Sequence, residues 1–363
     1  MKNYHILVIN PGSTSTKLSY YINEEHQFTC DVFHDSSILK TFPTINDQLD
    51  YRMEVVDQFL KEHDIQHLDA IACRGGASYS VVSGTYEVND LLIQDTKEAK
   101  GGLYHSSMLG VQMAQQIQKK YDCKVFMSDP TVVDEYSDLA RVTGIDGIYR
   151  RSICHALNLK AVAKKFAQSL NRPYEDLNLI VCHIDGGITI TAHQYGKMID
   201  GNDGGGGEGP FTPTRMGSMA ISDVIHYLWD LSREEMLNLC SVTGGLSNYF
   251  GTSNADVIHQ KVEQNDPKAT LVWNAMIYQV AKQIGAMSTV LCGHVDGIVL
   301  TGGLLRFSDV SEQIKDRCGW IAPIALYPGE YEQEALAKNA LEVLKGEKQA
   351  MIYTGKPVWD HFE

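Results

Sequence analysis

Residues 10–17 carry the clearest chemical signal in this chain. Their order is Asn-Pro-Gly-Ser-Thr-Ser-Thr-Lys, so four hydroxyl side chains and an ammonium group follow a turn-forming Asn-Pro-Gly. Turn N–H groups, hydroxyls and a lysine together suit an anion such as phosphate. The spacing differs from that of the common phosphate loop, which ends in Gly-Lys-Ser/Thr before a helix. We predict a phosphate-binding turn here, and the alternative is an ordinary Ser/Thr-rich hairpin turn.

Two later glycine pairs also follow apolar runs that are typical of buried strands. The run 179–184 ends in Asp-Gly-Gly at 185–187, and a second strand-like run, 188–193, returns from it. The run 297–300 ends in Thr-Gly-Gly at 301–303 and leads into a helix-like segment, 307–318. Glycine lets the backbone approach a ligand closely. Three such turns, in this order, favour a duplicated fold that grips a nucleotide.

Two arginines follow segments that could deliver them to a site. Arg74 comes after the short strand-like run 70–73 and precedes Gly75-Gly76, whereas Arg215 ends a glycine- and proline-rich loop. The planar guanidinium matches carboxylate and phosphate groups. Each arginine alone is more often a salt-bridge residue. Beside a phosphate-binding turn the pair suggests a site for two anions, as phosphoryl transfer requires, because charge repulsion must be cancelled while the reacting atoms are held in line.

The elements that must position these residues alternate between strands and helices. Apolar periodicity predicts helices over 47–63, 107–121, 152–170 and 331–345, with strands between them. This pattern predicts an α/β fold of two domains. We expect residues 1–150 and the C-terminal helix, about 331–363, to form one domain, and residues 151–330 to form the other.

Composition limits the classes of function. A chain of 363 residues can build two full cores. Its net charge of -14 argues against a nucleic-acid surface, and no apolar run reaches membrane-spanning length. The eight cysteines are scattered without a Cys-x-x-Cys pair, which indicates reduced thiols in a cytoplasmic protein.

Residues 10–17 resemble the signature of the acetate kinase family. Segments 74–76, 128–130, 150–158 and 208–215, with His105, look more like its butyrate kinase branch. Acetate kinases carry Phe-His-Gly-Thr-Ser-His where this chain has Ile-Cys-His-Ala-Leu-Asn at 153–158, and Gly-Asn-Gly where it has Asp-Gly-Gly at 185–187. The resemblance runs from residue 6 to about 345. It implies an actin-like, sugar-kinase-like fold: two ribonuclease-H-like domains with a nucleotide cleft between them.

The resemblance also implies roles for individual residues. The transferring phosphate and its metal would meet Asn10, Ser13, Ser15 and Lys17; the second phosphate turn would be His183, Gly186 and Gly187; the adenosine turn would be Gly302 and Gly303. The catalytic residues would be Arg74, Asp129, His155 and Arg215, with His105 joining the two arginines at the substrate. The metal ligands would be Asn10, Asp129 and Glu334, although Glu330 and Glu332 are close enough to compete with Glu334. From the residues alone, the favoured interpretation of His155 is an ordinary histidine on a helix face, bound to a neighbour.

The activity that the resemblance implies is phosphorylation of a short-chain carboxylic acid by ATP with Mg²⁺, reversible and ATP-forming in fermentation. The butyrate kinase branch implies butyrate, ATP, butyryl phosphate and ADP as the reactants and products. Branched-chain acids, propionate and acetate are alternatives, because one methylene is worth only about 1–3 kcal/mol in an apolar pocket. A non-catalytic actin-like ATPase module is a further alternative. The family's relatives lead us to expect a homodimer or larger homo-oligomer, with no nucleic-acid or membrane partner.

Overall fold

The computed structural model describes residues 2–102 and 104–362, and it divides into two compact units. Unit 1 contains residues 1–134 and 331–363, and unit 2 contains residues 135–330. The last segment of the chain therefore returns to the first unit. The assignment of domains with a boundary near residue 150 stays a prediction.

Unit 1 is built on a seven-stranded sheet in the order β12-β5-β6-β4-β1-β2-β3. The central strand β1 pairs antiparallel with β2 and parallel with β4, and β4 pairs parallel with β6. Residues Ile6 to Ile9 are fully buried, as expected for a continuous apolar run in a central strand. The strands are β1 (His5–Pro11), β2 (Ser15–Ile22), β3 (Glu25–Phe33), β4 (Ala70–Cys73), β5 (Thr85–Glu87), β6 (Lys124–Ser128) and β12 (Met351–Ile352).

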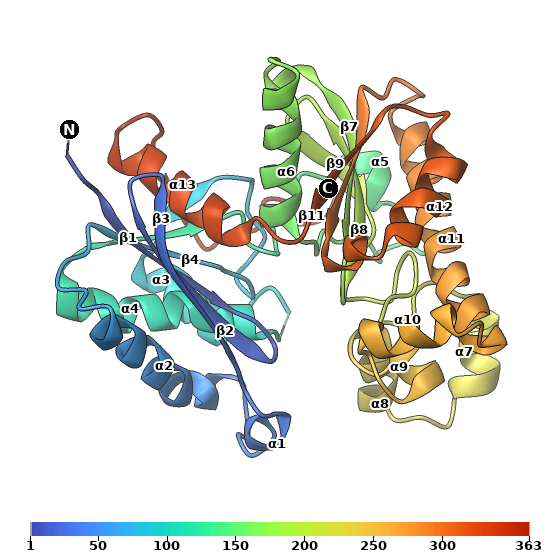
Figure 1. The fold of residues 1–363 in the computed structure, drawn as a ribbon, viewed down its shortest axis with the longest axis horizontal. Helices are drawn as coiled ribbons and strands as arrows, with labels where there is room; N and C mark the ends of the chain where they lie inside the picture. The colour runs from blue at the N-terminus through green and yellow to red at the C-terminus, as the bar shows by residue number, and fades with distance from the viewer. Residues whose placement is uncertain (1, 103, 363) are drawn as a thin grey trace. The chain divides into compact units, whose positions relative to one another are not determined.

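Helices cover both faces of the unit 1 sheet. Helix α13 (Glu332–Leu344) packs on β1 and β4 from one face, and helices α2 (Leu49–Glu62) and α4 (Leu109–Tyr121) lie on the other face (Figure 1). The first helix of the unit, α1 (Ser36–Leu39), is one turn long, and α3 (Asp90–Lys97) packs on α4. Two 3-10 turns, Asn46–Gln48 and Ser106–Met108, precede α2 and α4.

Unit 2 repeats this plan with a five-stranded sheet in the order β11-β10-β7-β8-β9. Its strand β7 pairs antiparallel with β8 and parallel with β10, just as β1 pairs with β2 and β4. The strands are β7 (Asn178–Ile184), β8 (Ile188–Gln194), β9 (Lys197–Gly201), β10 (Gly297–Gly302) and β11 (Ile324–Pro328). The duplication predicted from the glycine turns is therefore present in the strand pairing.

Helix α6 (Ala156–Ser169) lies on one face of the unit 2 sheet, and α11 (Pro267–Val290) and α12 (Ser308–Cys318) lie on the other (Figure 1). Asp266 caps α11, Pro267 occupies its first turn, and the buried Trp273 donates from Nε1 to Asp309 at 2.8 Å. The shorter helices are α5 (Asp138–Arg141), α7 (Ile221–Leu228), α8 (Arg233–Ser241), α9 (Gly245–Phe250) and α10 (Ala255–Glu263), and the 3-10 turns are Tyr174–Asp176 and Gly303–Arg306.

The helix predicted over 152–170 starts four residues later than expected. Residues 152–155 are irregular because the carbonyl of Ile153 accepts a hydrogen bond from the N–H of Gly204 at 2.7 Å, outside any helix. The helices predicted over 47–63, 107–121 and 331–345 form α2, α4 and α13 within two residues at each end. The predicted α/β class is confirmed.

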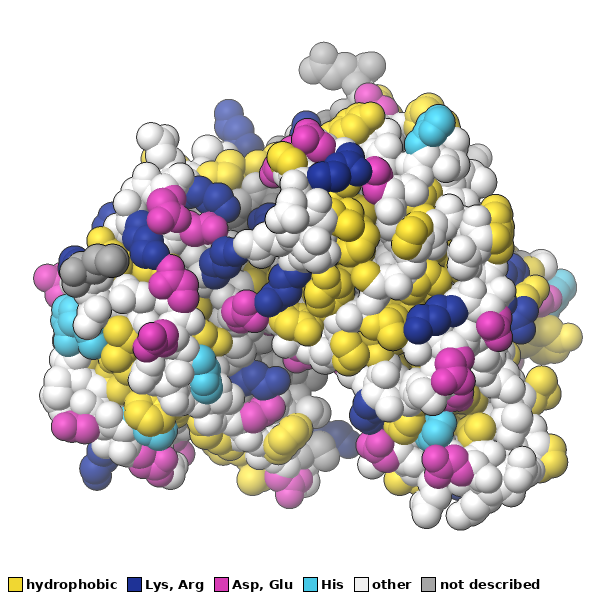
Figure 2. Space-filling view, turned by 45° about the horizontal axis from the view of Figure 1, so that its top comes forward, with side chains coloured by type: hydrophobic (Ala, Val, Ile, Leu, Met, Phe, Trp, Pro, Cys, Tyr) yellow, Lys and Arg dark blue, Asp and Glu magenta, His cyan; other side chains and the backbone are white. Residues whose placement is uncertain are grey.

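The surface carries mixed charge. Figure 2 shows Lys and Arg side chains interspersed with Asp and Glu over one face of the protein. None of the helices within the described residues is both long enough and apolar enough to cross a membrane. All eight cysteines are free thiols, and burial raises the pKa of Cys123 and of Cys318 to about 11.

Candidate active site

The first turn, residues 10–17, joins the end of β1 to the start of β2. The N–H of Gly12 donates to the carbonyl of Ser15 at 2.8 Å, which closes the turn, and Asn10 faces Lys17 across the strand pair. Ser13 is exposed, and its Oγ lies 3.1 Å from Nε2 of His105. Lys17 is half-buried, with Nζ 3.4 Å from a carboxylate oxygen of Asp31. The structure thus brings Asn10, Ser13, Lys17 and His105 together in unit 1.

His105 is held in one orientation. Its Nδ1 accepts a hydrogen bond from the backbone N–H of Ser107 at 3.1 Å. A neutral imidazole that accepts at Nδ1 carries its proton on Nε2. His105 therefore donates from Nε2 toward the hydroxyl of Ser13.

Arg74 lies beside Asn10 because Asn10 is the last residue but one of β1 and Arg74 directly follows β4, the neighbouring parallel strand. Both contact Glu332, the first residue of α13: Asn10 Nδ2 donates to Glu332 Oε2 at 2.7 Å, and Arg74 Nη1 lies 3.1 Å from the same oxygen. Asn10 is 6% exposed and Glu332 is 3% exposed. The buried carboxylate of Glu332 and amide of Asn10, with the partly buried guanidinium of Arg74, form a polar cluster in unit 1.

The three candidate glutamates for the metal lie in different places. Glu332 contacts Asn10, Glu334 is exposed, and Glu330 belongs to unit 2. Residues two apart on an α-helix are separated by about 200°, so Glu332 and Glu334 face nearly opposite sides of α13. The metal role of Glu334 stays a prediction, and the carboxylate that the structure places beside Asn10 is that of Glu332.

Asp129 follows β6 with its backbone in the left-handed region, at a φ of 40°. It is 3% exposed, and its Oδ1 accepts from Ser83 Oγ at 2.7 Å and from the N–H of Gly84 at 2.8 Å. A non-glycine residue in this conformation is strained and persists where its surroundings hold it. These two bonds fix one carboxylate oxygen of Asp129. Among the described residues, no hydrogen bond joins it to Asn10 or Glu332.

The second turn, residues 183–187, follows β7 in unit 2 and is surrounded by polar groups. His155 and His183 are stacked, with ring centroids 4.0 Å apart and planes at 17°. His155 Nδ1 lies 2.7 Å from the hydroxyl of Thr189. The predicted residues His155 and His183 are therefore in direct contact.

A chain of hydrogen bonds assigns the proton on His183. Thr301 donates its hydroxyl to the carbonyl of Gly329 at 3.0 Å, so its oxygen accepts from Asn158 Nδ2 at 3.3 Å. The same amide donates to His183 Nδ1 at 2.9 Å. Because Nδ1 accepts, the neutral His183 carries its proton on Nε2 and donates from there.

Arg215 lies against the second turn. A methyl group on Gly187 would be 2.2 Å from Nη1 of Arg215, so any larger residue there would displace the guanidinium from its present position. The hydroxyl of Thr212 donates to the carbonyl of Gly186 at 2.7 Å and accepts from the N–H of Arg215 at 3.1 Å. The loop that carries Arg215 is thus tied directly to the glycine pair.

The third turn, residues 301–303, packs on the second. Gly302 has a φ of 107°, and a methyl group there would be 2.3 Å from the carbonyl oxygen of Ile184. The N–H of Gly303 donates to Asp185 Oδ2 at 2.6 Å. Gly302 and Gly303 therefore hold the two turns together.

The glycine-rich loop 201–209 is anchored by ion pairs. Arg150 Nε donates to Glu208 at 2.8 Å, and its Nη1 donates to Asp200 at 2.9 Å. These two carboxylates raise the pKa of Arg150 even though burial opposes them. Burial raises the pKa of the Asp203 carboxyl, and that carboxyl accepts from the N–H groups of Gly205 and Gly206.

Comparison with known proteins identifies the family. The model of the acetokinase family matches residues 120–317, which is more than half of the chain. The chain belongs to the acetokinase family. Its fold is similar to that of a propionate kinase from Francisella tularensis, with a TM-score of 0.75, 18% identity, and coverage of 93% of this chain and 98% of that one. It is equally similar to an acetate kinase from Porphyromonas gingivalis, with a TM-score of 0.75, 17% identity, and coverage of 94% and 100%.

These relatives share the actin-like ATPase fold of two α/β domains, which confirms the predicted fold. Members of the acetokinase family are carboxylate kinases, and the arginines and glycine turns of this acetokinase are groups that such a reaction can use. Three polar side chains contact the turns of the site but received no preferred role from the sequence: Arg52, Asn158 and Glu332. Each lies on a helix far along the chain from the turn that it contacts, so no local pattern marks it.

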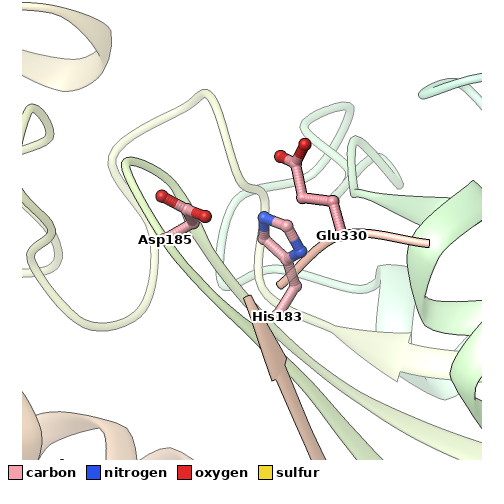
Figure 3. Close-up of side chains that lie close together, drawn as sticks. All are labelled: His183, Asp185 and Glu330. Atoms are coloured by element: carbon pink, nitrogen blue, oxygen red, sulfur yellow. The ribbon is translucent and has the colours of Figure 1, made fainter. Parts of the chain in front are cut away.

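One cluster of side chains in unit 2 has ligand atoms that could hold a cation. Nitrogen and oxygen atoms of His183, Asp185 and Glu330 all lie within 4.8 Å of one another (Figure 3). Carboxylate oxygens suit Mg²⁺, a hard cation. The Nε2 of His183 carries a proton, so it has no lone pair for a metal ion. A cation at this cluster would therefore be held by Asp185 and Glu330.

Proposed function

We propose that this acetokinase uses ATP and Mg²⁺ to phosphorylate a short-chain carboxylate, and that the acid is butyrate. The products are butyryl phosphate and ADP, and the reaction also runs in reverse to form ATP. The supporting observation is that each unit carries an arginine at a glycine turn: Arg74 beside Asn10, and Arg215 against Gly187. Two anions must meet in this reaction, and the two arginines together cancel charge on them.

The chemical step needs no base. A carboxylate oxygen of butyrate attacks the γ-phosphorus of ATP, and the bond from that phosphorus to the β–γ bridging oxygen breaks. The electron pair of this bond leaves with ADP, and no proton is transferred. The protein therefore positions the reactants and stabilises the charge of the phosphoryl group in the transition state of the transfer.

Arg74 has donors left for a substrate carboxylate. Its contact with Glu332 uses Nη1, and a guanidinium has five N–H donors in all. Glu332 thereby fixes the side chain without consuming it. We assign Arg74 and His105 to the acid, and Arg215 to the acid and the phosphoryl group.

The two stacked histidines provide donors for phosphate oxygens. His183 donates from Nε2, because Asn158 occupies its Nδ1. His155 is oriented by Thr189 and by the ring of His183. We propose that both stabilise charge on the phosphoryl oxygens, beside Gly186 and Gly187 of the second turn, and that Gly302 and Gly303 approach the adenosine.

The oxygen ligands proposed for magnesium lie in unit 1. We propose Asn10 and Asp129 as ligands or positioning groups, with Glu332 better placed than Glu334 because it contacts Asn10. When bound, the ion neutralises charge on the phosphate oxygens. The free thiols are compatible with a cytoplasmic location.

The choice of butyrate is supported by segment 153–158. Here Cys154 and Leu157 are each 3% exposed, in the string that replaces Phe-His-Gly-Thr-Ser-His of acetate kinases. The segment contains His155 and the first turn of α6, so its side chains are close in sequence to the proposed chemistry. Propionate, acetate and branched-chain acids are the competing substrates.

The arginines provide the test. Acyl phosphate formed from ATP, Mg²⁺ and butyrate is trapped with hydroxylamine in the wild type and in Arg74→Ala and Arg215→Ala. We expect each variant to lose about 100-fold or more in kcat/KM, the usual loss when one group that stabilises developing charge is removed. Arg317→Ala, at an exposed arginine of α12, removes the same charge elsewhere and keeps full activity. Full activity in both site variants would contradict the proposal and favour an ATPase module that binds no carboxylate.

A further inference from the structure

Arg52 is a charged residue buried beneath the first turn. It comes from α2, and its side chain is 0% exposed. Its guanidinium donates to the backbone of the turn on one side and to its own helix on the other. The acceptors are the carbonyls of Gly12 (3.0 Å), Ser13 (3.2 Å) and Ser15 (2.9 Å), the hydroxyl of Thr16 (3.2 Å), and Oε1 of Gln48 (3.1 Å).

These bonds set the direction of every peptide group in the turn. The remaining carbonyl, that of Thr14, accepts from the N–H of His34 at 2.8 Å, so all four carbonyls of residues 12–15 are bound to protein donors. In a trans peptide, the N–H of the next residue points away from the carbonyl. The N–H groups of Ser13 and Thr14 therefore point away from Arg52. Neither donates to a protein acceptor within residues 2–102 and 104–362.

The charge of Arg52 is not balanced locally. Its acceptors are carbonyl, hydroxyl and amide oxygens, and no carboxylate within the described residues forms an ion pair with it. Burial lowers the pKa of Arg52 to about 10, so it stays protonated at pH 7. Burial, and then the charge of Arg52, lower the pKa of His34 to about 4, so this neighbour is neutral. An unpaired buried cation is costly, and an anion on the far side of the turn would offset that cost.

We propose that Arg52 is the positioning residue of the first turn: it binds the carbonyls of the turn from below, aims the N–H groups at a phosphoryl group, and supplies positive charge beneath that group. This inference rests on the proposed function for the identity of the ligand as the transferred phosphoryl group. The anion site itself follows from the bonds of Arg52. Arg52 touches no reacting atom and acts through the backbone of residues 12–15.

The test measures binding of inorganic phosphate by calorimetry, at constant ionic strength, together with KM and kcat of the hydroxylamine assay. Arg52→Met removes the charge and the bonds, and we expect the Kd for phosphate to rise about tenfold or more, as for loss of a charge-assisted bond. Arg52→Lys keeps the charge but not the planar guanidinium, so its Kd for phosphate should lie between those of the wild type and Arg52→Met. Lys17→Ala measures how much of the phosphate binding belongs to this turn.

Val56→Ala is the matched control, because Val56 is equally buried on the same helix and touches no atom of the turn through a hydrogen bond. It lowers stability and leaves the Kd for phosphate and the KM for ATP unchanged. If Arg52→Lys and Arg52→Met bind phosphate as tightly as Val56→Ala, the proposal is wrong. If Arg52→Met does not fold, the comparison of Arg52→Lys with Val56→Ala decides. If every variant and the wild type form no acyl phosphate while phosphate binding still depends on Arg52, the proposed function fails and the role of Arg52 stands.

Discussion

Single side chains at this site are fixed by partners that leave them one hydrogen-bonding role. His183 accepts at Nδ1 from Asn158, whose amide is itself oriented by Thr301. His105 accepts at Nδ1 from the N–H of Ser107. In both residues Nε2 therefore carries the proton of the neutral ring. This tautomer can donate a hydrogen bond to an anion without first gaining a proton.

Asn158→Asp should reverse the role of His183. A carboxylate only accepts, so Nδ1 of His183 should carry a proton in this variant. Either the neutral ring loses the proton on Nε2, or the ring gains a second proton and becomes an imidazolium. Nitrogen-15 chemical shifts of histidine report this directly, and we expect kcat to fall about tenfold. Thr189→Val, which removes the partner of His155, should leave the His183 signal unchanged. If Nδ1 of His183 stays unprotonated in Asn158→Asp, a group other than residue 158 orients His183.

A second residue-scale prediction separates the glutamates of α13. Glu332→Gln removes the buried carboxylate beside Asn10 and Arg74, so we expect lower activity and a higher Mg²⁺ concentration for half-maximal rate. Glu334→Gln, at an exposed position, should change neither quantity. Both are read from acyl phosphate formation against Mg²⁺ concentration. The opposite ranking of the two variants would restore Glu334 as the metal residue.

At the scale of elements, the site residues lie in turns at strand ends, and in unit 2 tight contacts join the second turn to the third. The turns could be predicted because the apolar runs, the glycine pairs and the hydroxyl string are local in sequence. Arg52 and the contact of Asn158 with His183 could not be predicted, and Glu332 could be predicted only as a competitor of Glu334, because these contacts form only when α2, α6 and α13 pack on the sheets. The start of α6 was misplaced for the same reason: the bond from Gly204 to Ile153 crosses about fifty residues of sequence.

Gly302→Ala tests the contact between the second and third turns. The added methyl group would overlap the carbonyl oxygen of Ile184, at a φ of 107° that an alanine rarely adopts. We expect the free energy of unfolding, measured in urea, to fall by about 2–4 kcal/mol and ADP binding to weaken. Gly285→Ala, in α11 with open space around the position, should be neutral or stabilise the protein by up to about 1 kcal/mol. Equal unfolding free energies for the two variants would mean that the turns can move apart freely.

At the scale of the whole molecule, the same strand plan is used twice, and each copy presents its own glycine turn and arginine. Unit 2 also carries an apolar surface that nothing in the described chain covers. Helix α7 has no buried residue, although it is rich in apolar side chains. Its Ile221 and Tyr227, and Trp229 just after it, are 74%, 82% and 75% exposed. Of these three residues, Tyr227 lines a groove of about 770 Å³, together with Leu228 of α7 and Leu271 of α11. Exposed apolar patches of this kind mark interaction sites.

We expect a second copy of the chain to cover this surface, giving the homodimer or larger assembly that the family resemblance implies. Tyr227→Glu would place a charge in that contact, so light scattering should show a smaller mass than for the wild type. Trp320→Glu, at an aromatic residue 79% exposed on another element, is the control and should leave the mass unchanged. A wild-type protein that is monomeric at micromolar concentration would contradict the expectation.

The central claim is the transfer of phosphate to a four-carbon acid, and a panel of acids tests it most directly. Hydroxylamine-trapped acyl phosphate is measured from ATP and Mg²⁺ with acetate, propionate, butyrate, valerate, isobutyrate and isovalerate. We predict the highest kcat/KM for butyrate, with losses of about tenfold or more for acids one carbon shorter or longer. A maximum at a branched acid, propionate or acetate would contradict the choice of butyrate. No product from any acid, with ATP still bound, would contradict the kinase itself.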